Sequence, residues 1–172
     1  MAYYVHSTTQ NGYTQETRTP APSWTESKRW ADAYFGEACA ILERLGFSEL
    51  RATPWDLDAR GVDIITADGA RIAWRCRDVR YLRYADITLR LSRPSGAPTE
   101  ARKIKEGAVD WLFWTWTTPT EVAAWVLLRA DRVAALMGEA SWPTRQVPNA
   151  TFVSIPFTAL KAVGAIVAAE GL

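Results

Sequence analysis

The feature that most constrains the fold is a tight turn between two runs of strand-forming residues. The segment Val62-Asp63-Ile64-Ile65 is rich in β-branched residues, and Asp68-Gly69 is a pair typical of a β-hairpin turn. The next residues, 71–77, alternate apolar side chains with arginines and an alanine, which is the period of a strand. This pattern predicts a hairpin with an aspartate on one strand and Arg75 and Arg77 on one face of the other.

The remaining sequence predicts a mixed α/β fold. An apolar stripe of helical period predicts a helix from residue 25 or 27 to residue 45, ended by Gly46. A strand at 84–91 is expected to complete a three-stranded antiparallel meander with the hairpin. Further along the chain we expect a helix at 99–107 with Thr99 as its N-cap, strands at 109–117 and 123–128, a helix at 131–137, a loop at 142–149, a strand at 152–155 and a final helix at 158–169.

Length and composition are those of one globular domain. The 172 residues, 48% hydrophobic and 23% charged, are enough to bury a substantial core. Residues 1–25 are rich in Thr, Ser, Gln, Asn and Pro, which predicts a flexible N-terminal arm before a single domain at 26–172. Because no apolar run is long enough to span a bilayer and no secretory signal is evident, we expect a cytoplasmic protein without a membrane partner, with Cys39 and Cys76 as buried thiols.

Basic residues are concentrated in one window of the chain. Residues 71–105 hold ten of the twenty Lys and Arg side chains against three acids, a net charge of +7, so the remainder carries −6. A basic band on an otherwise acidic domain favours a polyanionic partner, because binding to phosphates releases counterions. We therefore expect DNA binding, or else arginines that only solvate the surface or form ion pairs. The expected nucleic-acid-binding residues are Arg80, Arg83, Arg90, Arg93, Arg102, Lys103 and Lys105.

One acid falls within the apolar stripe of the first predicted helix. Glu37 lies near the centre of the stripe formed by Trp30, Tyr34, Ile41 and Leu45. A buried carboxylate has to be paired, protonated or metal-bound, because an unpaired buried charge is costly. Two interpretations remain open: a structural salt bridge to an arginine, or an acid directed into an active-site cleft.

The order helix, three strands, helix, strand over residues 28–117 resembles the restriction-endonuclease-like, or PD-(D/E)XK, superfamily. The resemblance implies that core with additional C-terminal strands and helices, a Mg²⁺-dependent nuclease activity, and a possible homodimer as in the resolvases of this superfamily. In its pattern a helix acid, a strand aspartate and an acid-or-glutamine, any residue, lysine triplet assemble one or two divalent cations. By position, Glu37 matches the helix acid and Asp63 the strand aspartate, so both are expected metal ligands, while Arg75 matches the acid or glutamine and Arg77 the lysine.

The two arginines change the chemistry that the resemblance implies. Mg²⁺ takes oxygen ligands, whereas Arg75 brings a permanent positive charge to a position where an oxygen ligand belongs. A guanidinium also stays protonated and cannot act as a base, although Arg77 can stabilise negative charge that develops on a phosphate. The family pattern is therefore present with altered catalytic positions.

Three accounts of function follow. In the first, Arg75 and Arg77 pair with Asp63 and Glu37, and the domain binds nucleic acid with degenerate or lost catalysis; this is the one we expect. In the second, Glu37 and Asp63 still hold Mg²⁺ with help from a migrated acid, and the chain is an active endonuclease. The candidate migrated acids are Asp56, Asp58, Asp86 and Glu100. In the third, the chain is a protein-interaction domain that uses exposed aromatics from its nine tryptophans, although those of the strand at 109–117 are expected in the core.

Overall fold

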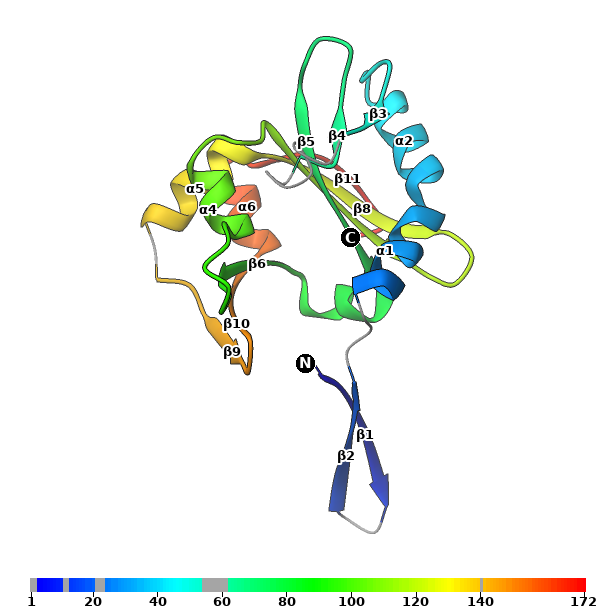
Figure 1. Ribbon diagram of the computed structural model, residues 1–172, viewed down its shortest axis with the longest axis vertical. Helices are drawn as coiled ribbons and strands as arrows, with labels where there is room; N and C mark the ends of the chain where they lie inside the picture. The colour runs from blue at the N-terminus through cyan, green and yellow to red at the C-terminus, as the bar shows by residue number, and fades with distance from the viewer. Residues whose placement is uncertain (1–2, 11–12, 21–23, 54–61, 140) are drawn as a thin grey trace.

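The computed structural model describes residues 3–10, 13–20, 24–53, 62–139 and 141–172. A six-stranded sheet forms its centre (Figure 1), with the strand order β11-β8-β7-β5-β4-β3. Its strands are β3 (Arg51–Ala52), β4 (Ile64–Ile65), β5 (Arg71–Asp78), β7 (Trp111–Thr117), β8 (Val122–Arg129) and β11 (Ile166–Glu170). The β5 and β7 strands run parallel, and the other neighbours in this sheet run antiparallel. The predicted α/β class is confirmed, and so is the β4–β5 hairpin.

The third strand of the predicted meander lies in a different sheet. The strand β6 (Asp86–Ser92) pairs with β10 (Ala150–Pro156), which also pairs with β9 (Thr144–Val147). A 3₁₀ helix, η1 (Val79–Tyr84), and Ala85 with φ of 49° turn the chain away after β5. The antiparallel meander of the central sheet is therefore β3-β4-β5, and the prediction of a loop at 142–149 was wrong for β9.

Five α-helices lie in the described part of the chain: α1 (Trp24–Ala33), α2 (Phe35–Arg44), α4 (Glu100–Lys105), α5 (Ala130–Glu139) and α6 (Phe157–Ala162). The single helix predicted from 25 or 27 to 45 is broken at Tyr34, whose hydroxyl donates a hydrogen bond to the Thr118 carbonyl at 2.7 Å. Gly46 ends α2 as predicted, with φ of 95°. Its N–H and that of Phe47 bond to the carbonyls of Glu43 and Leu42, the Schellman arrangement that favours glycine.

The final helix is shorter than predicted. Only Phe157–Ala162 is helical, and the segment after it is the strand β11, which pairs with β8. Gly164, with φ of 65°, reverses the chain between the two elements. The small and apolar residues at 166–170 fit either a helix or a strand by pattern, and pairing with the exposed side of β8 decides in favour of the strand.

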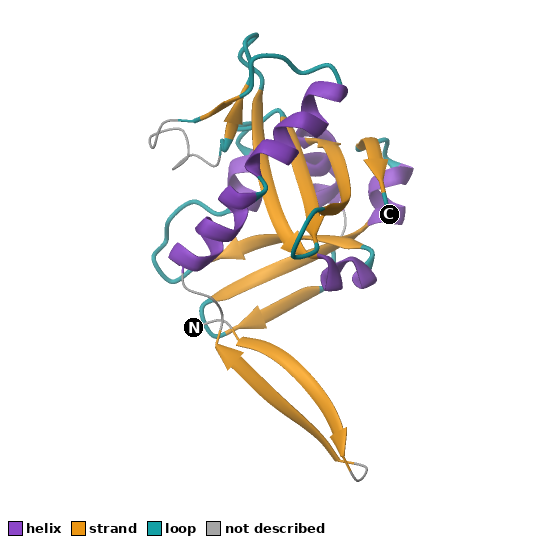
Figure 2. Cartoon of the chain, turned by 90° about the vertical axis from the view of Figure 1, so that its right-hand side faces the viewer, coloured by secondary structure: helices purple, strands orange, loops and turns teal. Residues whose placement is uncertain are grey.

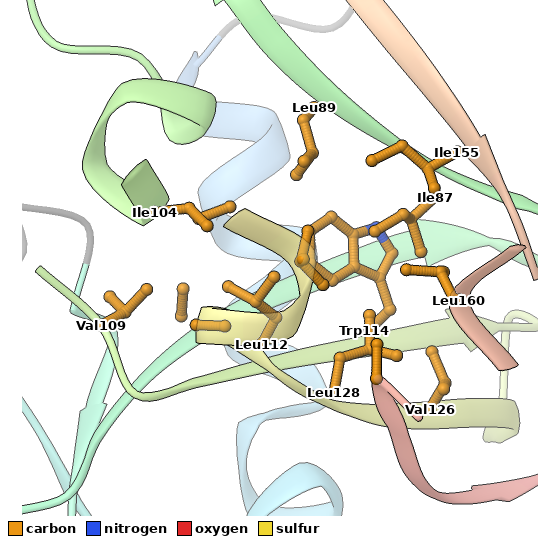
Figure 3. Close-up of a cluster of buried hydrophobic side chains, with 14 of the residues drawn as sticks. Ile87, Leu89, Ile104, Val109, Leu112, Trp114, Val126, Leu128, Ile155 and Leu160 are labelled. Atoms are coloured by element: carbon orange, nitrogen blue, oxygen red, sulfur yellow. The ribbon is translucent and has the colours of Figure 1, made fainter. Parts of the chain in front are cut away.

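Hydrophobic side chains fill both faces of the central sheet. One cluster joins α2 to the sheet through Ala38, Ile41 and Leu42. On the other face, β7 and β8 pack against α4, α5, α6 and the second sheet, and Figure 3 shows Trp114 at the centre of that cluster. Because side chains of β7 enter both clusters, this strand is buried on both faces. Each large side chain buried there contributes roughly 1.5–3 kcal/mol.

Two predictions concerned the arm and the cysteines. Within the segment expected to be a flexible arm, β1 (Tyr3–Gln10) and β2 (Tyr13–Pro20) pair antiparallel and project away from the two sheets (Figure 2). Cys39 and Cys76 are free and half-buried, and burial raises the pKa of both thiols.

None of the described helices combines the length and the apolar character needed to cross a membrane.

Candidate nucleic-acid interface

Three charged side chains meet on the face of the sheet that α4 covers, and we call them the Arg75 cluster: Asp63, Arg75 and Glu100. The Nε of Arg75 donates to Glu100 at 2.8 Å, and its Nη1 lies 3.4 Å from Asp63. Asp63 also accepts a 2.7 Å hydrogen bond from the backbone N–H of Trp74. The three side chains are 28%, 23% and 17% exposed for Arg75, Asp63 and Glu100. One guanidinium therefore bridges two largely buried carboxylates.

Local sequence explains why these side chains converge. Alternation along β5 sends Ile72 and Trp74 into the cluster under α2 and leaves Ala73 and Arg75 on the opposite face. Thr99 caps α4 by accepting a hydrogen bond from the Arg102 N–H at 3.4 Å. This cap sets Glu100 in the first turn of α4, directly over β5.

Glu100 is held in its ionised form. Burial alone would raise the pKa of its carboxyl, but the charge of Arg75, a hydrogen bond from the Arg90 N–H and the charges of Arg77 and Arg90 together lower this pKa below its ordinary value. The Arg90 N–H lies 3.0 Å from the second carboxylate oxygen of Glu100. The cluster is thus an ion pair rather than a neutral hydrogen-bonded network.

The Arg75 cluster does not fit a bound Mg²⁺ ion. Octahedral Mg²⁺ needs oxygen ligands, and the two carboxylates that meet here are joined by a guanidinium. Among residues 24–53, 62–139 and 141–172, no group of three or more Asp, Glu, His or Cys side chains could hold a metal ion. Two of the predicted migrated acids, Asp56 and Asp58, lie outside the described residues.

Glu37 occupies a different place from the one expected. It is exposed, and both of its carboxylate oxygens accept the backbone N–H of Val122 at 3.1 Å. Its helix packs on the face of the sheet opposite to the Arg75 cluster. Tyr34 and Ile41 of the predicted stripe are buried together with Ala38 and Leu42, so the buried side of α2 is centred near Ala38 and Glu37 lies at its exposed edge.

Arg77 is also paired differently from the prediction. Its Nη2 donates to the Thr88 carbonyl on β6 at 3.2 Å, not to Glu37. Its positive charge also acts on Asp86, where burial raises the pKa of the carboxyl, and a hydrogen bond from Ser154 and the charge of Arg77 partly oppose that rise. Arg77 therefore ties β5 to the start of β6, and Asp86 faces Arg77 rather than a metal site.

The predicted nucleic-acid-binding residues fall into two structural groups, and the first lies on η1. Arg80 forms an ion pair with Asp78 at 3.0 Å and lies over the ring of Tyr81. Arg83 lies 4.9 Å from the ring centre of Tyr84, which is 54% exposed. Cation–π contact of this kind leaves an arginine charged and accessible at the surface.

The second group surrounds α4 and the end of β6. Arg102 and Lys105 are exposed, and Arg102 pairs with Glu106 at 2.6 Å. Arg90, Arg93 and Lys103 are only partly exposed. Burial lowers the pKa of Lys103, and the charges of Arg75 and Arg93 lower it further, while Asp63 and Glu100 act in the opposite sense. The basic window is therefore split between a surface group and a group close to the Arg75 cluster.

The sequence did not single out two residues that lie beside Arg75. Glu100 was one of four candidate migrated acids, and Lys103 was expected only as a surface contact. Both line a small recess beside Arg75. Their spacing of three residues on α4 was the available signal, because side chains three apart share one face of a helix.

No model of a known protein family matches this chain, and a search of curated proteins finds no match to it either.

Proposed function

We propose that this chain is a nucleic-acid-binding protein of the PD-(D/E)XK nuclease-like superfamily in which the Arg75 cluster has replaced the metal site. The observation that carries the proposal is the bridge from Arg75 to Glu100 at 2.8 Å and to Asp63 at 3.4 Å. A guanidinium neutralises the carboxylates that would otherwise attract a divalent cation, and it cannot take a proton from water. The domain thus keeps phosphate-binding charge and loses the groups needed for hydrolysis.

The order of elements supports the assignment to this superfamily. Along the chain, α2 precedes the antiparallel strands β3, β4 and β5, which are followed by α4 and β7. This is the helix, three strands, helix, strand order that suggested the resemblance, with β3 in place of β6 as a member of the meander. The segment from η1 through the turn after β6 is then an insertion between β5 and α4, and it carries four of the basic side chains: Arg80, Arg83, Arg90 and Arg93.

The test is cleavage of supercoiled, linear and branched DNA in the presence of Mg²⁺ or Mn²⁺, with the intact protein and two variants. We expect no cutting by any of them. Asp63→Ala should lose thermal stability because it leaves part of the Arg75 charge uncompensated. The control is Asp32→Ala. Asp32 is 58% exposed and pairs with Lys28, which is 52% exposed, so its removal should change stability little. Metal-dependent cutting that disappears in Asp63→Ala would overturn the proposal.

A second candidate function is an active endonuclease with a migrated site. It is favoured by Glu100 and Lys103, an acid and a lysine on one face of α4 that both lie near Asp63. In this case Glu100→Gln and Lys103→Gln would each abolish cutting in the same assay. The third account, a protein-interaction domain built on tryptophans, lacks such support, because the seven tryptophans whose exposure is described are buried or half-buried.

A further inference from the structure

Two arginine side chains near α4 each have a buried donor that no described residue satisfies. The Nε atoms of Arg90 and Arg93 are buried and have no hydrogen-bond partner among the described residues. Buried polar groups are hydrogen-bonded in the large majority of cases, and an unsatisfied charged donor is especially costly. Two such donors three residues apart point to an acceptor from outside the chain.

Positive charge is crowded around these donors. The pKa of Arg90 is lowered by burial first and then by the charges of Arg93 and Arg75, against the opposing effect of Glu100. The charges of Arg75 and Arg93 also lower the pKa of Lys103. Five cations thus lie near three carboxylates, an excess of two positive charges: Arg75, Arg77, Arg90, Arg93 and Lys103 against Asp63, Asp86 and Glu100. Like charges at close range in a partly buried site repel one another. An anion that binds between or beside them offsets this repulsion by its attraction to each cation.

The backbone holds these side chains in place. Arg90, on β6, lies 5.3 Å from the ring centre of Phe152 on the neighbouring strand β10. Arg93 begins the turn that its carbonyl closes by accepting the Gly96 N–H at 3.1 Å. The hydroxyl of Thr99 donates to the Leu91 carbonyl at 3.4 Å, which joins the start of α4 to the end of β6. The two arginines and Lys103 are therefore fixed on elements that contact each other.

We propose that Arg90, Arg93 and Lys103 form a binding site for one phosphate group, which they hold without a metal ion. Guanidinium groups offer paired N–H donors that match the oxygens of a phosphate, and lysine adds a point charge. A phosphate held by the partly exposed guanidinium groups relieves the repulsion among the cations, and a shift of the two side chains toward it would bring the buried Nε donors to its oxygens. That the phosphate belongs to a nucleic-acid backbone rests on the proposed function, whereas the site would hold a free phosphate for the same chemical reasons.

The test is thermal unfolding of the full chain with increasing inorganic phosphate, at an ionic strength held constant with NaCl. Phosphate should raise the Tm of the intact protein, because a ligand that binds the folded state stabilises it. For Arg93→Gln and for Lys103→Gln, the phosphate concentration needed for the same rise should increase about tenfold or more, since each variant loses a charge-assisted contact. The matched control is Arg129→Gln, an arginine 51% exposed and paired with Asp131, which should respond like the intact protein.

A merely structural role predicts the opposite behaviour in phosphate-free buffer. If Arg93 served only to stabilise the fold, Arg93→Gln would lower the Tm without phosphate; as a ligand-binding cation in a crowded site, its replacement leaves the Tm unchanged or raises it. The proposed phosphate site would be overturned if Arg93→Gln and Lys103→Gln responded to phosphate as the intact protein does. A lower Tm of Arg93→Gln in phosphate-free buffer would overturn it as well.

A second experiment distinguishes a phosphate of a nucleic-acid backbone from free phosphate. Binding of a fluorescein-labelled DNA oligonucleotide is followed by anisotropy, and Arg93→Gln should weaken it and reduce the salt slope by about one. If phosphate raises the Tm as described but DNA does not bind, the phosphate site stands and the proposed function fails. If DNA binds equally well to Arg93→Gln and to the intact protein, the site is not part of the nucleic-acid interface.

Discussion

Replacement of Arg75 by methionine tests the Arg75 cluster most sharply, because methionine keeps the apolar stem and removes only the guanidinium. The variant leaves Asp63 and Glu100 without their shared partner. Removing one partner of a fully buried pair costs roughly 3–5 kcal/mol. Since the Arg75 and Glu100 side chains keep 28% and 17% exposure, we expect the low end of that range, about 3 kcal/mol. For a chain of this length that loss lowers the Tm by roughly 6–12 °C.

The matched control lies four residues earlier on the same strand. Arg71 donates two hydrogen bonds to Asp110, at 3.0 and 2.8 Å, but the two side chains are 39% and 41% exposed. An exposed pair contributes little, so Arg71→Met should cost about 1 kcal/mol or less. Calorimetry of the two variants gives the comparison directly. Equal losses in the free energy of unfolding for Arg75→Met and Arg71→Met would refute the reasoning, because the difference in burial would then make no difference to stability.

Further predictions concern acid stability, the end of α2 and the exposed acid on that helix. Burial raises the pKa of Glu100, but Arg75 and its other partners lower it overall, so its stabilising effect is present above the unfolded pKa of about 4.3 and is lost as the pH falls through the lower folded value. Urea unfolding of Glu100→Gln at a series of pH values should show a weaker acid dependence than that of the intact protein; equal dependence would contradict this assignment. Gly46→Ala should lower the free energy of unfolding by roughly 1–2 kcal/mol, because its φ of 95° disfavours a side chain, and a urea midpoint unchanged from the intact protein would show that this turn relaxes freely. Glu37→Ala should leave DNA binding unchanged in the anisotropy assay, and weaker binding would place Glu37 in the interface after all.

Local patterns predicted the elements that depend on local chemistry. The Asp68-Gly69 turn, the alternation of β5 and the glycine that ends α2 are each determined by a few adjacent residues, and the structure contains all three. The partners of strands depend on distant residues instead. Nothing within 84–91 shows that β6 pairs with β10, and nothing within 166–170 shows that β8 offers it an open edge.

The candidate site shows the same division. Asp63 directly precedes β4 and Arg75 lies on the paired strand β5, so the turn and the strand period already favoured their proximity. Glu100 arrives from α4, twenty-five residues after Arg75, and only the packing of that helix over β5 selects it from the four candidate acids. Glu37 was misplaced because the prediction left Ala38 and Leu42 out of the apolar stripe, and these two buried residues move its centre away from Glu37.

The most direct test of the central claim is the anisotropy of labelled DNA with the intact protein in EDTA, measured over a series of salt concentrations. We predict binding at low salt without any divalent metal. The logarithm of the affinity should then fall linearly with the logarithm of the salt concentration, with a slope of about −0.9 for each phosphate contacted on duplex DNA. No binding at low salt in EDTA, with binding and cleavage restored by Mg²⁺, would contradict the account and favour a metal-dependent nuclease.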